Sequence, residues 1–217
     1  MSNRADYHKY VFKHGRLLGQ FDRMYRESKR VPWDQDRTVN SWWADVAIRF
    51  LELRSPYDTA IDVGCGLGYF TNKFAHLCRT VVGVDVSSAA IQKAKQKFPN
   101  LRFQVLDIRK AHRRMRFFDL VVVKDIFWYV FPDLVQVVRN LTALTAPGGR
   151  LFVFQSFPNL GRPFVGKHAV PNPEMLFQCF QDSFVSEYSC SCQEYLRSQN
   201  GPMCMALLRK KRGTREA

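Results

Sequence analysis

The chain has 217 residues, of which 46% are hydrophobic, a size and composition that suit one globular domain with one sizeable core. Its net charge of +14 indicates an anionic partner such as a phosphorylated substrate, a nucleic acid or an acidic surface. No apolar run approaches the roughly 18 residues of a membrane span, and residues 1–10 lack the hydrophobic region of a signal peptide, so we expect a soluble, cytoplasmic protein.

The N-terminal residues 1–37 mix aromatic and basic side chains without a long regular period. This composition predicts an N-terminal helical cap or lid with one or two short helices, rather than a separate domain. Tyr10, Trp33 and Asp34 are its candidate lid residues.

Strand and helix patterns alternate after the cap, which is typical of an α/β fold with a mostly parallel sheet. Helical spacing of apolar residues begins at 36, 69, 88, 132 and 173, and short apolar runs predict strands at 59–63, 80–85, 101–107, 118–123 and 150–155. Residues 145–149 predict a tight turn, and residues 184–196 and 203–209 predict the two arms of a final antiparallel hairpin.

The stretch AIDVGCGLGYF, residues 60–70, places three glycines at alternate positions directly after an apolar strand. Glycines at such a turn allow positive φ, and the following helix N-terminus offers unpaired N–H groups, so we expect a ligand to lie against the main chain here. Asp85 ends the next strand, where a carboxylate can accept both hydroxyls of a ribose. A nicotinamide dinucleotide would also fit these two strands.

Five motifs in order resemble the class I S-adenosylmethionine-dependent methyltransferases: IDVGCGLGYF, VVGVD, LDI, FDLVVVKDIFWYV and LTAPGGRLFVF. The resemblance covers about residues 38–208 and leaves a basic tail at 209–217. It implies a Rossmann-like, seven-stranded, mostly parallel sheet with helices on both faces and an antiparallel C-terminal hairpin. It also implies S-adenosyl-L-methionine as the cofactor.

The resemblance implies a role for each motif residue. Asp62 and the turn from Gly64 to Gly68 would hold the methionine portion of the cofactor, Asp85 the ribose, Asp107 the adenine amino group and the amide of Ile108 a ring nitrogen. The complete implied set is Asp62, Gly64, Cys65, Gly66, Gly68, Asp85, Val86, Asp107, Ile108 and Lys124.

The segments before the first motif and after the fourth and fifth strands are similar to small methyltransferases of polysaccharide or natural-product pathways, including the nodulation-type N-methyltransferases. The substrate does not follow from this resemblance. The six cysteines show no disulfide or zinc spacing, so we expect no metal.

Methyl transfer from a sulfonium requires mainly alignment of the acceptor and exclusion of water, with a general base for a hydroxyl acceptor. Candidate residues follow the fourth and fifth strands. Asp125, Tyr129 and His168 are the candidate catalytic residues, although a helix cap, core packing and a surface histidine would explain them as well. Lys124, Trp128, Gln155 and Lys167 are further candidates in these loops.

Three functions fit the sequence. The first is a methyltransferase acting on an oxygen or nitrogen of a small anionic metabolite such as a sugar, sugar phosphate or glycan end. The second is an RNA methyltransferase, which the net charge and the basic run at 109–116 favour. The third is a partner subunit that binds the cofactor without catalysis.

Overall fold

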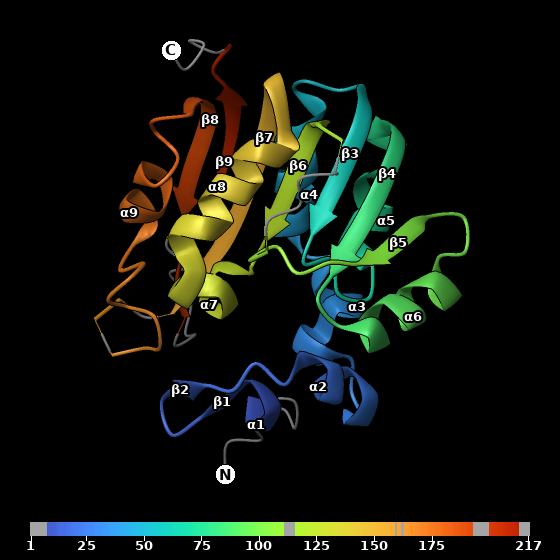
Figure 1. Ribbon diagram of the computed structural model, residues 1–217, viewed down its shortest axis with the longest axis vertical. Coiled ribbons are helices and arrows are strands. Elements are labelled where there is room, and N and C mark those ends of the chain that lie inside the picture. The colour runs from blue at the N-terminus through green and yellow to red at the C-terminus, as the bar shows by residue number, and fades with distance from the viewer. Residues whose placement is uncertain (1–7, 111–115, 159, 162, 193–199, 213–217) are drawn as a thin grey trace.

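The computed structural model describes residues 8–110, 116–158, 160–161, 163–192 and 200–212 (Figure 1). A seven-stranded sheet has the order β5-β4-β3-β6-β7-β9-β8. The strands are β3 (Tyr57–Val63), β4 (Cys78–Asp85), β5 (Arg102–Val105), β6 (Phe118–Lys124), β7 (Thr145–Pro158), β8 (Phe184–Cys192) and β9 (Asn200–Lys210). The pairs β3–β4, β3–β6, β4–β5 and β6–β7 are parallel, whereas β9 runs antiparallel to both β7 and β8, so the predicted fold class is confirmed.

The N-terminal cap, described from His8 to Thr38, lies beyond the carboxyl ends of the strands (Figure 1). It contains α1 (His8–Val11), a two-stranded ribbon of β1 (Phe12–Lys13) and β2 (Arg16–Leu17), α2 (Phe21–Glu27), the 3-10 turn η1 (Pro32–Asp34) and α3 (Gln35–Thr38). It thus holds more elements than the one or two short helices expected.

The helix predicted from Asp36 is divided in two. A break after α3 precedes α4 (Trp42–Glu52), because the Ser41 side chain accepts a hydrogen bond from the backbone N–H of Ala44 and caps a new helix there. The apolar residues keep helical spacing across this break, so the sequence pattern predicted one continuous helix.

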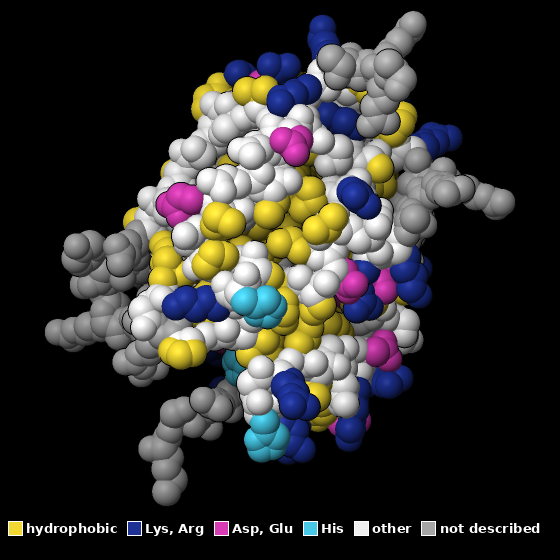
Figure 2. All heavy atoms as spheres, turned by 60° about the vertical axis from the view of Figure 1, so that its left-hand side comes forward, with side chains coloured by type: hydrophobic (Ala, Val, Ile, Leu, Met, Phe, Trp, Pro, Cys, Tyr) yellow, Lys and Arg dark blue, Asp and Glu magenta, His cyan; other side chains and the backbone are white. Residues whose placement is uncertain are grey.

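The remaining helices cover the two faces of the sheet (Figure 1). They are α5 (Tyr69–Phe74) with the turn η2 (Ala75–Leu77), α6 (Ser88–Lys97), α7 (Phe127–Val130) with η3 (Phe131–Asp133), α8 (Leu134–Leu144) and α9 (Pro173–Gln178). Figure 2 shows hydrophobic side chains gathered at the middle of the side that carries α8 and α9, with most Lys and Arg side chains nearer its margins.

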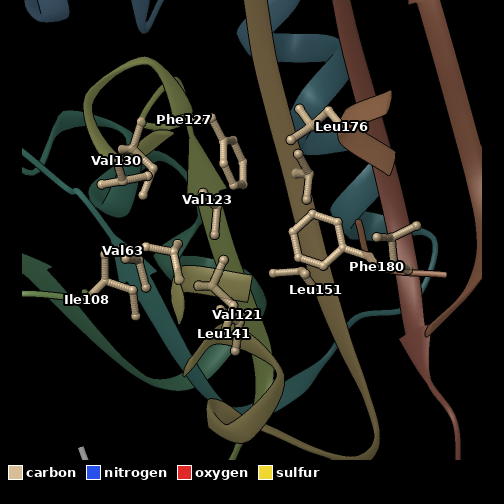
Figure 3. Packing of buried hydrophobic residues seen from close by; sticks show 14 of the residues in the cluster. Val63, Ile108, Val121, Val123, Phe127, Val130, Leu141, Leu151, Leu176 and Phe180 are labelled. Atoms are coloured by element: carbon tan, nitrogen blue, oxygen red, sulfur yellow. The ribbon is translucent and has the colours of Figure 1, made fainter. Parts of the chain in front are cut away.

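Buried apolar residues form a core on each face of the sheet. Alternate residues of β6 point to opposite faces, so Val121 and Val123 join one core and Leu120 and Val122 the other. Figure 3 shows the first core, where Leu141 of α8 and Leu176 of α9 pack over the central strands. These cores fix the strand ends that carry the predicted site.

Two predicted boundaries differ from the structure. Residues 145–149, which were predicted as a tight turn, belong to β7. In place of a turn, the pairing of β7 with β6 shifts register between Phe118 and Leu120 of β6. Strand β9 extends to Lys210, so Arg209 and Lys210, assigned to the basic tail, belong to the sheet. Residues 111–115 of the basic run lie outside the described residues.

Within the described ranges, no helix is both long and apolar enough to span a membrane, and no group of three or more His, Cys, Asp or Glu residues is placed to hold a metal ion. Cys65, Cys78, Cys179, Cys190 and Cys204 are free thiols.

Candidate active site

A cavity of about 690 Å³ lies between the N-terminal cap and the carboxyl ends of the strands. Nine of the predicted site residues line it: Asp62, Gly64, Cys65, Asp85, Val86, Ile108, Lys124, Asp125 and Tyr129. Ligand sites of open α/β sheets lie at this edge, where the strand pattern predicted the site.

The glycine turn is packed against the protein's own side chains. A Cβ on Gly64 would lie 2.3 Å from Ile126, a Cβ on Gly66 would lie 2.6 Å from Gln35, and a Cβ on Gly68 would lie 2.6 Å from Phe103. Gly64 lines the cavity, whereas Gly66 and Gly68 are not among its lining residues. The expectation that a ligand lies against the whole turn is therefore corrected, because two of the glycines admit neighbouring side chains instead.

The side chain of Gln35 covers this turn. Its Oε1 accepts a hydrogen bond from the backbone N–H of Leu67 at 3.0 Å, and its Nε2 donates to the Tyr25 hydroxyl at 3.0 Å. Gln35 and Tyr25 both line the cavity, and the sequence predicted neither of them as a site residue. Nothing in an irregular N-terminal segment indicates which polar side chain will meet a loop 32 residues away.

Asp85 is buried at the end of β4, with one backbone N–H on each carboxylate oxygen. Gly66 donates to Oδ2 and Ser87 to Oδ1, each at 2.9 Å. Burial raises the pKa of Asp85 to about 6, although these N–H groups oppose the shift. A carboxylate has about four lone-pair positions, so Asp85 can still accept hydrogen bonds from the cavity side.

Asp62 is the second buried carboxylate. Its Oδ2 accepts a hydrogen bond from the Thr71 hydroxyl at 2.5 Å. Burial raises its pKa to about 7, and the Thr71 hydrogen bond and the charge of Lys124 oppose the increase. Two buried carboxylates in one cavity favour a ligand that brings hydroxyl donors or positive charge.

The structure does not place Asp107 where the resemblance implies it would bind the adenine amino group. Its carboxylate pairs with Arg109 through two bonds of 2.8 Å, and this pairing lowers its pKa. It does not line the cavity, whereas Leu106 and Ile108 on either side of it do. They supply an apolar wall of the kind that a purine ring packs against.

Lys124 and Asp125 form an ion pair at the end of β6, 2.5 Å apart. Asp125 takes the left-handed conformation, with φ at 56°. The backbone N–H of Ser156 donates to its Oδ1 at 2.7 Å, and its own N–H donates to the Phe154 carbonyl at 2.8 Å. A left-handed non-glycine residue held from three sides has a fixed side chain at the cavity wall.

Tyr129 lines the cavity within a cluster of rings from the cap. Its ring centroid lies 5.3 Å from that of Phe21 and 5.5 Å from that of Trp33. Trp33 also lines the cavity, but Tyr10 and Asp34 are not among its lining residues. Tyr129 of α7 thus packs against the cap. This position is compatible with a role in packing and with a role at the cavity.

His168 lies outside the cavity lining, is exposed, and packs edge-on against Phe131 with centroids 5.5 Å apart. Gln155 is buried and accepts a hydrogen bond from the backbone N–H of Phe127, and Lys167 donates to the Leu160 carbonyl. Trp128 lines the cavity and donates to the Ser156 carbonyl. The structure therefore brings Asp125 and Tyr129 together at the cavity but not His168.

A further set of lining residues was not predicted. We call the part of the cavity that they line the apolar arm, and they are Thr38, Val39, Ser41, Trp42, Trp43, Phe70, Phe154, Ser156, Phe157, Pro158, Gly201 and Met203. The residues of α4 and β9 lie far apart in the sequence, and their periodicity indicated only core packing. The antiparallel pairing of Ser156 with Met203 brings the ends of β7 and β9 to this arm.

The fold and this cavity resemble those of class I methyltransferase domains. Residues 61–153 match the family model described as methyltransferase domain. The N-methyltransferase NodS from Bradyrhizobium japonicum has the same fold, with a TM-score of 0.69, 21% identity, and coverage of 82% of this chain and 99% of that one. The resemblance predicted from the motifs is confirmed.

Two curated relatives extend the comparison. The nodulation protein S of Sinorhizobium fredii is 30% identical over 62% of this chain and 65% of its own length. A ubiquinone biosynthesis O-methyltransferase of Coxiella burnetii is 33% identical over 48% of this chain and 44% of its own length. The matched region thus spans less than two thirds of either relative.

Proposed function

We propose that this chain transfers a methyl group from S-adenosylmethionine to an oxygen or nitrogen of a small molecule. The observation that carries the proposal is one cavity in which two buried carboxylates, Asp62 and Asp85, face the same space as the fixed Asp125. A NodS structure in complex with S-adenosyl-L-homocysteine has a TM-score of 0.69 to this chain, which supports the choice of cofactor. The relatives carry N-methyltransferase and O-methyltransferase names, so both acceptor atoms remain in the proposal.

The residues present fit the cofactor. Asp85 would accept the ribose hydroxyls, Leu106 and Ile108 would enclose the adenine, and Asp62 with Gly64 and Cys65 would lie by the methionine portion. Val86, 42% exposed at the cavity edge, would lie beside the ribose. Asp107 would reach the adenine amino group only by releasing Arg109, because the two are paired.

The bound cofactor would supply an activated methyl group, and the residues of the chain would align its acceptor. Asp125 would orient the acceptor and receive its proton, since its carboxylate is fixed beside Lys124 and the Ser156 N–H. Tyr129 and Trp128 would exclude water from that position. His168 has no place in this arrangement, because it lies outside the cavity lining.

The anionic character predicted for the acceptor is not part of the proposal. Among the lining residues that the structure describes, Lys124 is the only lysine or arginine, and it is paired with Asp125. A negatively charged acceptor would meet three carboxylates with that one cation. The RNA alternative depends on the net charge of +14 and on the run at 109–116, of which residues 111–115 are not described.

Incubation with radiolabelled S-adenosylmethionine and a small-molecule extract tests the proposal. Label should enter a small molecule. Asp85→Ala should weaken binding of S-adenosylhomocysteine about a hundredfold, because charged hydrogen bonds to two hydroxyls are lost. Asp182→Ala, an exposed carboxylate, is the matched control and should bind normally. Label in RNA, or cofactor binding with no labelled product, would overturn the proposal in favour of the RNA enzyme or the non-catalytic subunit.

A further inference from the structure

The apolar arm differs in chemistry from the rest of the cavity. Among its described lining residues, none has a charged side chain, and the polar side-chain groups are the hydroxyls of Thr38, Ser41 and Ser156 and the indole N–H groups of Trp42 and Trp43. The Ser41 hydroxyl already donates to the Thr38 carbonyl at 2.7 Å. The charged residues of the lining, Asp62, Asp85, Lys124 and Asp125, all lie at the ends of β3, β4 and β6.

Five of the twelve residues that line this arm are aromatic. Trp42 and Trp43 begin α4 and stack with their ring centroids 3.8 Å apart and an angle of 27° between the planes. Phe70 and Phe154 pack with Trp43 in one core cluster, and Met203 packs against it. Phe157 belongs to the other core cluster, and its ring centroid lies 5.1 Å from that of Trp128.

Trp42 is unusual because its ring remains in contact with water. Trp42 is 55% exposed although it lies at the cavity, whereas Trp43 behind it is buried. A large exposed aromatic ring beside an apolar recess is typical of a surface that a ligand covers. The stacked pair holds the Trp42 ring in a fixed place at the first turn of α4.

We infer that the methyl acceptor has an apolar, ring-containing body without negative charge, which lies in the apolar arm against Trp42 while its reacting oxygen or nitrogen faces Asp125. This inference rests on the proposed methyltransferase function and defines its substrate class. An apolar body would bury surface of the arm that is now exposed to water, and burial of apolar surface favours binding. The carboxylates at the inner end disfavour an anion and favour a neutral or cationic acceptor.

A carbohydrate acceptor fits this arm less well. A sugar ring can stack on tryptophan, but its hydroxyls need hydrogen-bonding partners when they leave water. Carbohydrate hydroxyls would find few partners here, because the described lining of the arm offers three hydroxyl side chains, one of them already bonded, and the indole N–H groups of two tryptophans.

The test uses the whole chain saturated with S-adenosylhomocysteine and a neutral apolar fluorophore, N-phenyl-1-naphthylamine. The fluorophore should bind saturably. Trp42→Glu should weaken it about tenfold, because it places a charge in the arm, and Trp42→Phe should bind within about twofold of the natural chain. Val135→Glu on α8, 68% exposed and outside the cavity lining, is the matched control and should leave binding unchanged. S-adenosylhomocysteine affinity should stay the same in all three variants.

Competition then identifies the class of acceptor. 1-Naphthylmethylamine should displace the fluorophore at concentrations about tenfold lower than 1-naphthoate or maltotetraose. Equal binding of the fluorophore to Trp42→Glu, or stronger displacement by naphthoate or maltotetraose, would overturn the inference. Failure of the natural chain to bind S-adenosylhomocysteine refutes the proposed function, whereas intact cofactor binding without fluorophore uptake refutes this inference alone.

Discussion

Asp85 combines two requirements that oppose each other. Its oxygens must be ionised to accept strong hydrogen bonds, yet burial raises its pKa to about 6. The N–H groups of Gly66 and Ser87 partly offset that burial. The carboxylate therefore titrates close to neutral pH, and the ligand that it binds should report the titration.

We expect the affinity for S-adenosylhomocysteine to fall as the solution becomes acidic. Ribose hydroxyls donate to the ionised form, so binding is strong above the pKa of about 6 and decreases up to about tenfold for each pH unit below it. Calorimetric titration between about pH 5 and pH 8 measures this slope. A constant affinity across that range would show that Asp85 does not bind the ribose.

The sequence predicted the residues whose position depends on a strand end. Asp62, Asp85, Lys124 and Asp125 all lie at the cavity because each lies at or next to the end of a strand of recognisable pattern. Contacts between distant segments left no local signal, so Gln35 above Gly66 and Trp42 in the apolar arm were missed. The prediction that His168 lies at the site failed for the same reason, because the position of a loop residue depends on packing and not on sequence periodicity.

At the scale of whole elements, one carboxylate attaches the N-terminal cap to the sheet domain. The Oδ1 of Asp22 accepts hydrogen bonds from the Ser87 and Ser88 hydroxyls and the backbone N–H of Ala89, between 2.9 and 3.1 Å. These groups form the N-terminus of α6, where negative charge is favoured, and the Ala89 N–H lowers the pKa of Asp22. A lysine of α6, Lys93, donates to the Tyr25 carbonyl and supports the same contact.

Asp22→Ala should loosen the cap. We expect a loss of about 1–2 kcal/mol in the free energy of unfolding, the range for removal of a helix-capping side chain. Trypsin should then cleave within the cap sooner than in the natural chain, and cofactor affinity should fall because Tyr25 and Gln35 lose their support. Asp36→Ala, in the same cap but outside this contact, should change neither measurement. Unchanged cleavage of Asp22→Ala would refute this attachment.

At the scale of the whole molecule, the net charge of +14 does not describe the cavity. The described lining contains three aspartates and one lysine, so the positive charge is concentrated elsewhere on the surface. Composition predicted an anionic partner because it averages over all positions, whereas the charge that a substrate meets depends on which residues the fold brings to one edge of the sheet.

Asp62 makes the stability of the whole molecule depend on pH. Its pKa is about 7 in the fold and near 3.8 in the unfolded chain, so the folded state binds the additional proton between these values. The contribution of Asp62 to the free energy of unfolding therefore falls as pH rises from about 4 to 7 and remains low above that range.

Asp62→Asn removes this titration while keeping an oxygen that can accept from Thr71. The stability of the variant relative to the natural chain should rise with pH, by on the order of 4 kcal/mol between about pH 4 and pH 8. Urea unfolding of both proteins across that range measures the difference, and the other titrating groups cancel because both chains share them. A stability difference between the two proteins that does not change with pH would mean that Asp62 is ionised throughout. Bound cofactor should reduce this stability difference at high pH if its positive charge lies beside Asp62.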